Sequence, residues 1–169
     1  MMYTGFYDSK LVILSILVAT LCSFGFMNLN NRFIDSSGKN NRKWIVLSSF
    51  MMGLGIWTMH FIGMLGYDTH VHVTYQLGYL LGSLMLVIFT SFFVAMSIVK
   101  SKLSLVSVIV VSIVMGFGII GMHEMGMKAM EMEVAIKTDP LVMILAYLFA
   151  VFTSLVAILI SFHIRNTQN

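Results

Sequence analysis

The sequence has 169 residues, of which 59% are hydrophobic and 10% are charged, whereas soluble domains carry roughly 25% charged residues. This composition excludes an ordinary water-soluble domain, and the net charge of +3 does not indicate nucleic-acid binding, because the basic residues lie in short connections between apolar stretches. The single cysteine, Cys22, excludes an internal disulfide framework.

Five apolar stretches come close to the ~20 residues that a helix needs to cross a bilayer. Only helices and closed barrels can span a membrane, and these stretches are too long for strands. We therefore predict an all-α fold, a polytopic transmembrane helical bundle that forms a single domain over residues 1–169 and has the lipid bilayer as its surroundings. The spans are expected at residues 10–27, 44–65, 77–99, 103–122 and 140–162.

A short histidine motif ends the second span and occurs again at the end of the fourth. Residues 59–64 read Met-His-Phe-Ile-Gly-Met, and residues 122–127 read Met-His-Glu-Met-Gly-Met. Each copy follows a Gly-x-Gly sequence, at residues 53–55 and 116–118. The two copies are 63 residues apart and in register, so the second and fourth spans are repeats of each other.

The other three spans also resemble one another. Each opens on a polar residue that is followed fifteen residues later by a serine. These pairs are Asp8 and Ser23, Gln76 and Ser91, and Asp139 and Ser154. The repeat unit is therefore a plain helix followed by a motif helix, in the order plain, motif, plain, motif, plain.

A unit of two spans returns the chain to the side on which it began, so successive units are parallel. His60 and His123 are then expected on the same side of the membrane and at similar depth. The connections on one side hold seven lysine and arginine residues against three on the other. Because basic loops stay in the cytoplasm, we predict an outside N-terminus, a cytoplasmic C-terminus and both motifs near the outer face.

The motifs offer imidazole nitrogen and thioether sulfur. Residues four apart share a helix face, which pairs each histidine with the last methionine of its motif, and the first methionine can join if the helix opens at the motif glycine. Thioether with imidazole selects copper over hard cations. The candidate metal ligands are Met59, His60, Met64, Met122, His123 and Met127. A structural or proton-handling role for the histidines, with methionines that only pack, stays open at this point.

The sequence shows no nucleotide-binding loop, no nucleophile with a base, no catalytic carboxylate pair and no cysteine–histidine zinc cluster. We therefore predict that the protein is not an enzyme. Besides a sensor, the same groups suit a small membrane transporter or an ion or metal pathway. They also suit a haem protein with His60 and His123 as axial ligands, or an accessory subunit whose histidines only pack.

These residues resemble the MHYT domain, a bacterial integral membrane sensor domain named after its Met-His-Tyr-Thr signature. The resemblance covers essentially the whole chain, through Tyr7-Asp8, the Gly-x-Gly-x-Trp sequence that ends at Trp57, and residues 59–64. It implies a multi-pass sensory module of the bacterial plasma membrane. In that family the Met and His residues are proposed to bind copper and to sense oxygen, carbon monoxide or nitric oxide. We therefore expect a module that binds copper at the outer face and senses a diatomic gas or redox state.

The sequence departs from the family pattern at the centre of each motif. Phe61 and Ile62 replace the tyrosine and threonine in the first copy, as do Glu124 and Met125 in the second. The third motif of the family is also missing. The chain is therefore interpreted as a truncated, stand-alone version without an output domain, whose signal passes to a separate cytoplasmic or membrane protein or through a homo-oligomer.

Overall fold

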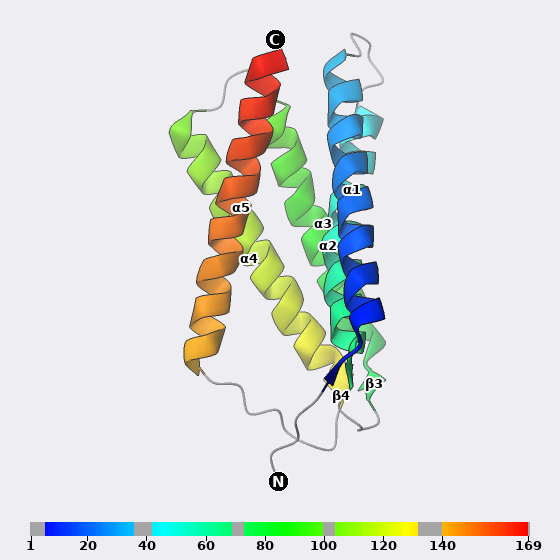
Figure 1. Cartoon of the computed structure of the whole chain (residues 1–169). Coiled ribbons are helices and arrows are strands. Elements are labelled where there is room, and N and C mark those ends of the chain that lie inside the picture. Colours follow the sequence, from blue (N-terminus) through cyan, green and yellow to red (C-terminus); the bar gives the residue numbers. More distant parts are fainter. Residues whose placement is uncertain (1–5, 36–41, 69–72, 100–103, 132–139, 169) are drawn as a thin grey trace.

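Five long helices build the protein, in a computed structural model that describes residues 6–35, 42–68, 73–99, 104–131 and 140–168. Each helix is long and apolar enough to cross a membrane, which confirms the predicted all-α bundle with five spans (Figure 1). The helices are α1 (Ser9–Asp35), α2 (Arg42–Leu65), α3 (Leu77–Ile98), α4 (Leu105–Ala129) and α5 (Pro140–Gln168).

Three helices run past the ends of the expected spans. The first continues to Asp35 beyond residue 27, the fourth to Ala129 beyond residue 122, and the fifth to Gln168 beyond residue 162. Hydropathy marks only the apolar part of a helix, whereas backbone hydrogen bonding continues through polar residues such as Asn28 and Arg32. The second motif therefore lies inside α4 and not beyond its end.

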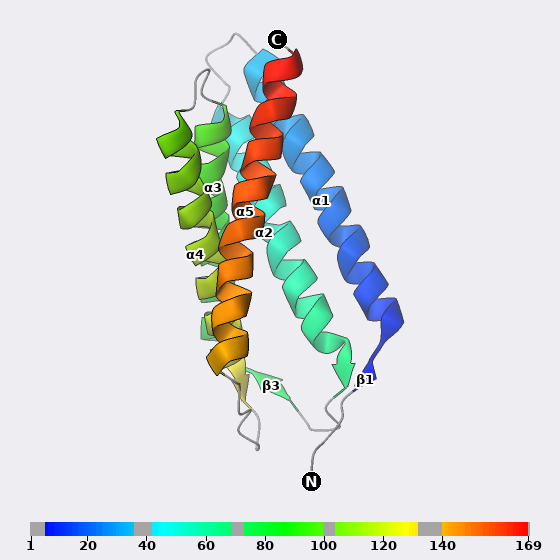
Figure 2. The same cartoon turned by 60° about the vertical axis from the view of Figure 1, so that its left-hand side comes forward.

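The helices pack in chain order: α1 on α2, α2 on α3, α3 on α4 and α4 on α5. Figures 1 and 2 show α1 and α5 as the two edge helices of this series. Only 11% of the apolar window of each edge helix is buried, against 33% for the three helices between them. The exposed side chains of the edge helices are mostly large and apolar, as expected where a helix faces lipid.

Two short strand pairs close one end of the bundle, which we call the motif end (Figure 2). The strands are β1 (Phe6–Tyr7), β2 (Tyr67–Asp68), β3 (Thr74–Tyr75) and β4 (Met130–Glu131). β1 pairs with β2 and β3 with β4, both antiparallel. Each pair joins the residues before a plain helix to those after the following motif helix. The backbone N–H of Asp8 donates to Gly66 O at 2.7 Å, and that of Gln76 donates to Ala129 O at 2.7 Å.

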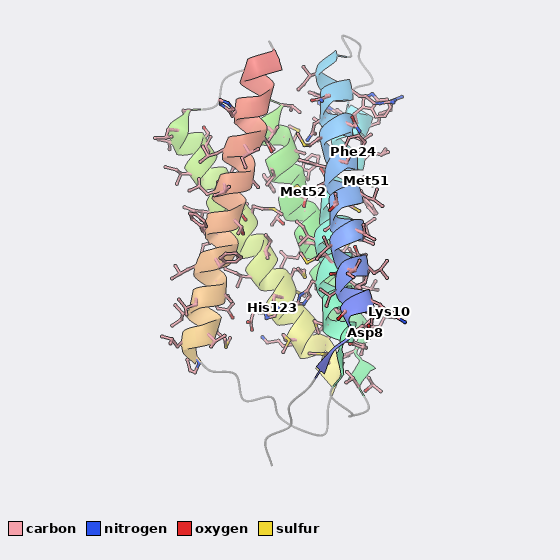
Figure 3. All side chains as sticks on the ribbon, in the orientation of Figure 1. Asp8, Lys10, Phe24, Met51, Met52 and His123 are labelled. Atoms are coloured by element: carbon pink, nitrogen blue, oxygen red, sulfur yellow. The ribbon has the colours of Figure 1, made fainter. Side chains whose placement is uncertain are left out.

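Side-chain caps and proline define where several helices begin. The Asp8 carboxylate accepts a hydrogen bond from the backbone N–H of Lys10 at 2.8 Å, and both residues lie at the start of α1 (Figure 3). Ser104 caps α4 in the same way, because its hydroxyl accepts from the N–H of Ser107. α5 begins at Pro140, a position that needs no backbone donor. Asp139, assigned above to the same repeat position as Asp8, lies outside the described residues.

The two-helix repeat also appears in the packing at the Gly-x-Gly sequences. An added Cβ at the first glycine would meet the next plain helix. At Gly53 it would lie 2.6 Å from Ile88 Cγ1, and at Gly116 it would lie 2.6 Å from Val151 Cγ2. We call these first-glycine contacts. Each joins a motif helix to the plain helix that follows, and glycine is needed because the backbones approach too closely for a side chain.

The second glycine meets the preceding plain helix. A Cβ at Gly55 would lie 2.5 Å from Cys22 Cβ, and one at Gly118 would lie 2.7 Å from Thr90 Cβ. We call these second-glycine contacts. Cys22 therefore serves as a small packing residue against α2. The agreement between equivalent contacts in successive units shows that the sequence repeat is a repeat of structure.

The core lies in the half of the bundle away from the motif end. It is a cluster of buried apolar side chains with serines beside them, whose hydroxyls donate to carbonyls one turn back in their own helices. Such small polar residues allow close helix approach without an unsatisfied group. The apolar members are Phe26, Ile45, Val94, Ala95, Ile98, Val108, Met115 and Ile158.

Candidate functional site

The two motif histidines are in contact with each other. The ring centroids of His60 and His123 lie 4.9 Å apart, with the ring planes at 73°. Figure 3 shows His123 in the lower half of α4, where this helix converges on α2. Helical geometry places each histidine five or six residues before its helix end, so both stand at the same level near the motif end. The structure thus joins two residues that are 63 positions apart in the sequence.

The glycine of the second motif admits the His60 ring. An added Cβ at Gly126 would lie 3.4 Å from His60 Nε2 and 3.2 Å from Phe61 Cζ. His60 therefore rests on the backbone of α4, one turn beyond His123. His60 Nε2 is buried and has no hydrogen-bond partner among the described residues. A buried polar atom without a partner is rare and calls for an explanation.

Aromatic side chains surround the first motif. Phe61 is buried, with its ring 4.4 Å from Trp57 and 5.3 Å from His60, centroid to centroid. On its other side the Tyr75 ring lies 6.3 Å from Phe61, and burial raises the pKa of the Tyr75 hydroxyl, so it stays protonated at neutral pH. The Trp57 indole N–H donates to Ser83 Oγ at 3.0 Å. These contacts hold α2 and α3 together beside the histidines.

We expect Ser83→Ala to destabilise the protein by about 1 kcal/mol, because it leaves the N–H of the half-buried Trp57 without its acceptor. Ser91→Ala is the matched control. It removes a hydroxyl from the same helix that is equally buried and has no hydrogen-bond partner among the described residues, so stability should stay the same or rise. Denaturant titration in detergent, followed by Trp57 fluorescence in a Trp44→Phe background, measures both. Equal losses in the two variants would contradict the assigned role of the Trp57–Ser83 hydrogen bond.

The four candidate methionines differ in how far their side chains are exposed. Met122 is 1% exposed, whereas Met59 is 39% exposed. Met64 and Met127 are half-buried. Both motif helices continue unbroken through Gly63 and Gly126, so the opening that would turn the first methionine toward its histidine does not occur. The histidines are thus brought together, while Met59 faces outward.

Within the described part of the chain, no three His, Cys, Asp or Glu side chains come together in a way that could hold a metal ion. The motif thioethers are then the side-chain donors that the sequence offers to complete a metal site at the paired histidines. That donor combination favours a soft ion such as copper over zinc, calcium or magnesium.

One polar contact was not anticipated from the sequence. The Tyr147 hydroxyl of α5 donates to the Glu124 carboxylate of α4, directly beside His123 in the chain. Nothing in the sequence pattern marks Tyr147, because it lies in an apolar helix and outside the repeated positions. The contact ties α5 to the second motif helix close to the histidine pair.

Known proteins match the chain through its repeats. A family described as "Bacterial signalling protein N terminal repeat" and named MHYT matches residues 53–112 and 116–169. These two segments begin at the equivalent glycines Gly53 and Gly116. The first covers the motif-bearing half of α2, all of α3 and the start of α4, and the second covers the motif-bearing part of α4 and all of α5.

Curated relatives extend the match over nearly the whole chain. It is 35% identical over 160 residues to the bifunctional diguanylate cyclase/cyclic di-GMP phosphodiesterase MucR of Pseudomonas aeruginosa, which is 95% of this chain and 23% of that protein. It is 28% identical over 156 residues to the signaling protein YkoW of Bacillus subtilis (92% and 19%). It is also 28% identical over 155 residues to the cyclic di-GMP phosphodiesterase NbdA of Pseudomonas aeruginosa (90% and 20%). The chain thus spans about a fifth of the length of these relatives. No solved structure matches it.

Proposed function

The chain belongs to the MHYT family of bacterial signalling proteins, and from that membership we propose that this multi-pass membrane sensory domain binds copper at its paired histidines. The observation that carries the proposal is the buried Nε2 of His60, which has no hydrogen-bond partner among the described residues and lies in contact with a second imidazole. No donor among the described residues forms a hydrogen bond with this nitrogen. Its lone pair is therefore available to bind a metal ion.

The separation of the two rings fits a shared metal ion. With metal–nitrogen bonds of about 2 Å, two imidazoles in tetrahedral arrangement have centroids about 5 Å apart, and the observed separation is 4.9 Å. Axial ligation of a haem iron requires the rings on opposite sides of the porphyrin, roughly 6 Å apart. The haem alternative therefore needs the histidines farther apart than they lie here, and this difference supports the copper proposal.

The remaining donors are thioethers of the same motifs. Met122 is buried and Met64 and Met127 are half-buried, so these three are better candidates than the outward-facing Met59. Copper, when bound, would supply a soft redox-active ion that takes a diatomic gas such as oxygen, carbon monoxide or nitric oxide as a further ligand. Phe61 and Trp57 would limit the access of water from the α3 side.

The position of the histidines suggests how such a sensor signals. His60 belongs to α2 and His123 to α4, two helices that meet at the motif end while α3 packs against both. A ligand that favours one arrangement of these helices shifts the population toward it. The positive-inside prediction places this site near the outer face of the plasma membrane. We propose that the shift reaches an output protein on the cytoplasmic side, in keeping with relatives whose names describe cyclic di-GMP enzymes.

Elemental analysis of protein purified in detergent tests the proposal. We expect about one copper ion per chain in the wild type and a loss of at least tenfold in both His60→Ala and His123→Ala, because each removes one of two imidazole ligands. Met85→Leu is the matched control. It removes a methionine that is 66% exposed on α3 and should leave copper unchanged. Copper far below one per chain in the wild type, or copper unaffected by either histidine variant, would refute the site.

A further inference from the structure

Positive charge gathers around one tryptophan at the end of the bundle opposite the motif end. Trp44 is the third residue of α2 and is half-buried. The guanidinium carbon of Arg32, in the last turn of α1, lies 5.4 Å from the centroid of its ring. The ammonium nitrogen of Lys43 lies 5.2 Å from it. Both distances are within the range of cation–π attraction, so one indole holds a cation from each of two helices.

No carboxylate that the structure describes neutralises these cations. Arg32, Lys43 and the neighbouring Arg42 are exposed. The two carboxylates among the described side chains, Asp8 and Glu124, belong to the motif end. Like charges that are held close together repel each other, and an anion bound between them removes this repulsion. The charges around Trp44 therefore suit an anionic ligand.

The position of Trp44 along α2 suits the level of the lipid phosphates. Two charged residues, Arg42 and Lys43, precede it, and the apolar part of the helix follows it. Tryptophan is enriched at the boundary between the membrane and water, where the lipid headgroups lie. Arg32 reaches the same level from α1, because it lies over the Trp44 ring. The cations are thus expected beside lipid headgroups rather than free in solution.

An apolar seam continues from the tryptophan along the contact between α1 and α2. Trp44, Leu47 and Met51 follow one another on one face of α2, at offsets of three and four residues. Figure 3 shows Phe24 of α1 at a height similar to that of Met51, and an added Cβ at Gly25 would lie 2.8 Å from Met51 Cε. Leu47, Met51 and Phe24 are all exposed. A hydrocarbon chain along this seam would therefore contact apolar side chains of both helices.

We propose that the ends of α1 and α2 bind one anionic phospholipid, such as phosphatidylglycerol, with its phosphate between Arg32 and Lys43. The planar guanidinium donates paired hydrogen bonds to phosphate oxygens, and the ammonium supplies the second charge. One acyl chain lies along the seam, over Leu47 and Met51. A free phosphate ion would make no contact with the seam, so the two features together favour a lipid. Phosphatidylcholine binds less well, because its choline group adds another positive charge beside the two cations.

The fluorescence of Trp44 in vesicles tests this inference. The protein with Trp57→Phe is placed in mixtures of phosphatidylcholine and phosphatidylglycerol, in which one lipid at a time carries bromine atoms on its acyl chains. Bromine quenches only a nearby indole, so the ratio of quenching by the two lipids gives their relative occupancy beside Trp44. We expect a preference of at least about fivefold for phosphatidylglycerol, because two cations act on one phosphate. High salt should lower this preference.

Three further variants locate the preference. Arg32→Gln combined with Lys43→Gln should reduce it to about twofold or less, because both charges at the ring are lost. Lys10→Gln is the matched control, since it removes an exposed lysine at the motif end and should leave the preference unchanged. The protein with Trp44→Phe in place of Trp57→Phe reports the surroundings of Trp57, which bonds to Ser83 near the motif end, and should show no preference.

The inference is overturned if both lipids quench Trp44 equally, or if the double variant keeps the preference. It is also overturned if Lys10→Gln lowers the preference as much as the double variant does. Excess inorganic phosphate, added at constant ionic strength, separates the lipid from a free ion. If it abolishes the preference, the cations bind phosphate alone and the lipid proposal is refuted. A chelator keeps copper out of every sample, so these outcomes are independent of the proposed metal site.

Discussion

Gly126→Leu is expected to remove at least about nine-tenths of the bound copper while the helices remain folded. The side chain would project from α4 into the place of the His60 ring, whose Nε2 lies 3.4 Å from the position of an added Cβ. His60 would then leave its contact with His123, although all six candidate ligands remain in the chain. The experiment thus tests whether copper binding depends on where the His60 ring lies, because the imidazole itself is still present.

Gly126→Ala is the graded control for this prediction. Its Cβ would lie 3.2 Å from Phe61 Cζ, a contact that the ring can relieve by a small movement, so most copper should be retained. Copper content by elemental analysis and helix content by circular dichroism measure the two effects. Full copper retention in the leucine variant would show that His60 need not lie on Gly126 to bind the metal.

Gly53→Leu and Gly116→Leu are expected to destabilise the protein by at least about 3 kcal/mol each, at the upper limit of overpacking effects. A Cβ at Gly53 would lie 2.7 Å from the Cα of Ile88, and one at Gly116 would lie 2.9 Å from the Cα of Val151. Backbone atoms cannot turn aside as a flexible side chain can, so the helices would have to separate along their length. Leucine is a good helix former, so the loss reports packing alone.

Gly78→Leu is the matched substitution, since an added Cβ there has no neighbouring atom within 4 Å among the described residues. Its stability should stay within about 0.5 kcal/mol of the wild type. Unfolding by denaturant in detergent gives all three values. If Gly78→Leu proved as harmful as Gly53→Leu, the first-glycine contacts would not be what joins the helices.

The sequence predicted the five helices and their repeat because both depend on local patterns. An apolar stretch near 20 residues has few alternatives in a membrane, and the 63-residue spacing identified His60 and His123 as equivalent. Neither the length of the apolar stretches nor the spacing of the motifs predicts how each helix is rotated about its axis relative to its neighbours. Spacing along α2 could pair His60 with Met64, but only the packed structure shows His60 on Gly126 and Met59 facing outward.

The strand pairs and the Tyr147–Glu124 contact were missed for different reasons. Two-residue strands are too short to give a periodic signal, although the repeated tyrosines at residues 7 and 75 mark the position of β1 and β3. Tyr147 meets Glu124 because α5 packs on α4, a contact between distant positions that only tertiary structure creates. α1, α4 and α5 run past the apolar stretches from which the spans were predicted, because polar residues extend helices beyond their apolar parts.

The strand pairs at the motif end have a mechanical consequence. β1–β2 and β3–β4 fasten the end of each motif helix to the start of its plain helix, while the equivalent pairing occurs at no described residue of the opposite end. A unit that tilts as a rigid body about this end would have its pivot beside the histidines and would shift the core that packs the opposite half. From His60 to Arg42 is about 27 Å at 1.5 Å per residue, so a tilt of about 5° at the pivot displaces the far end of α2 by about 2 Å. Through such a tilt, a small change at the imidazole pair would become a larger displacement at the other end of the bundle.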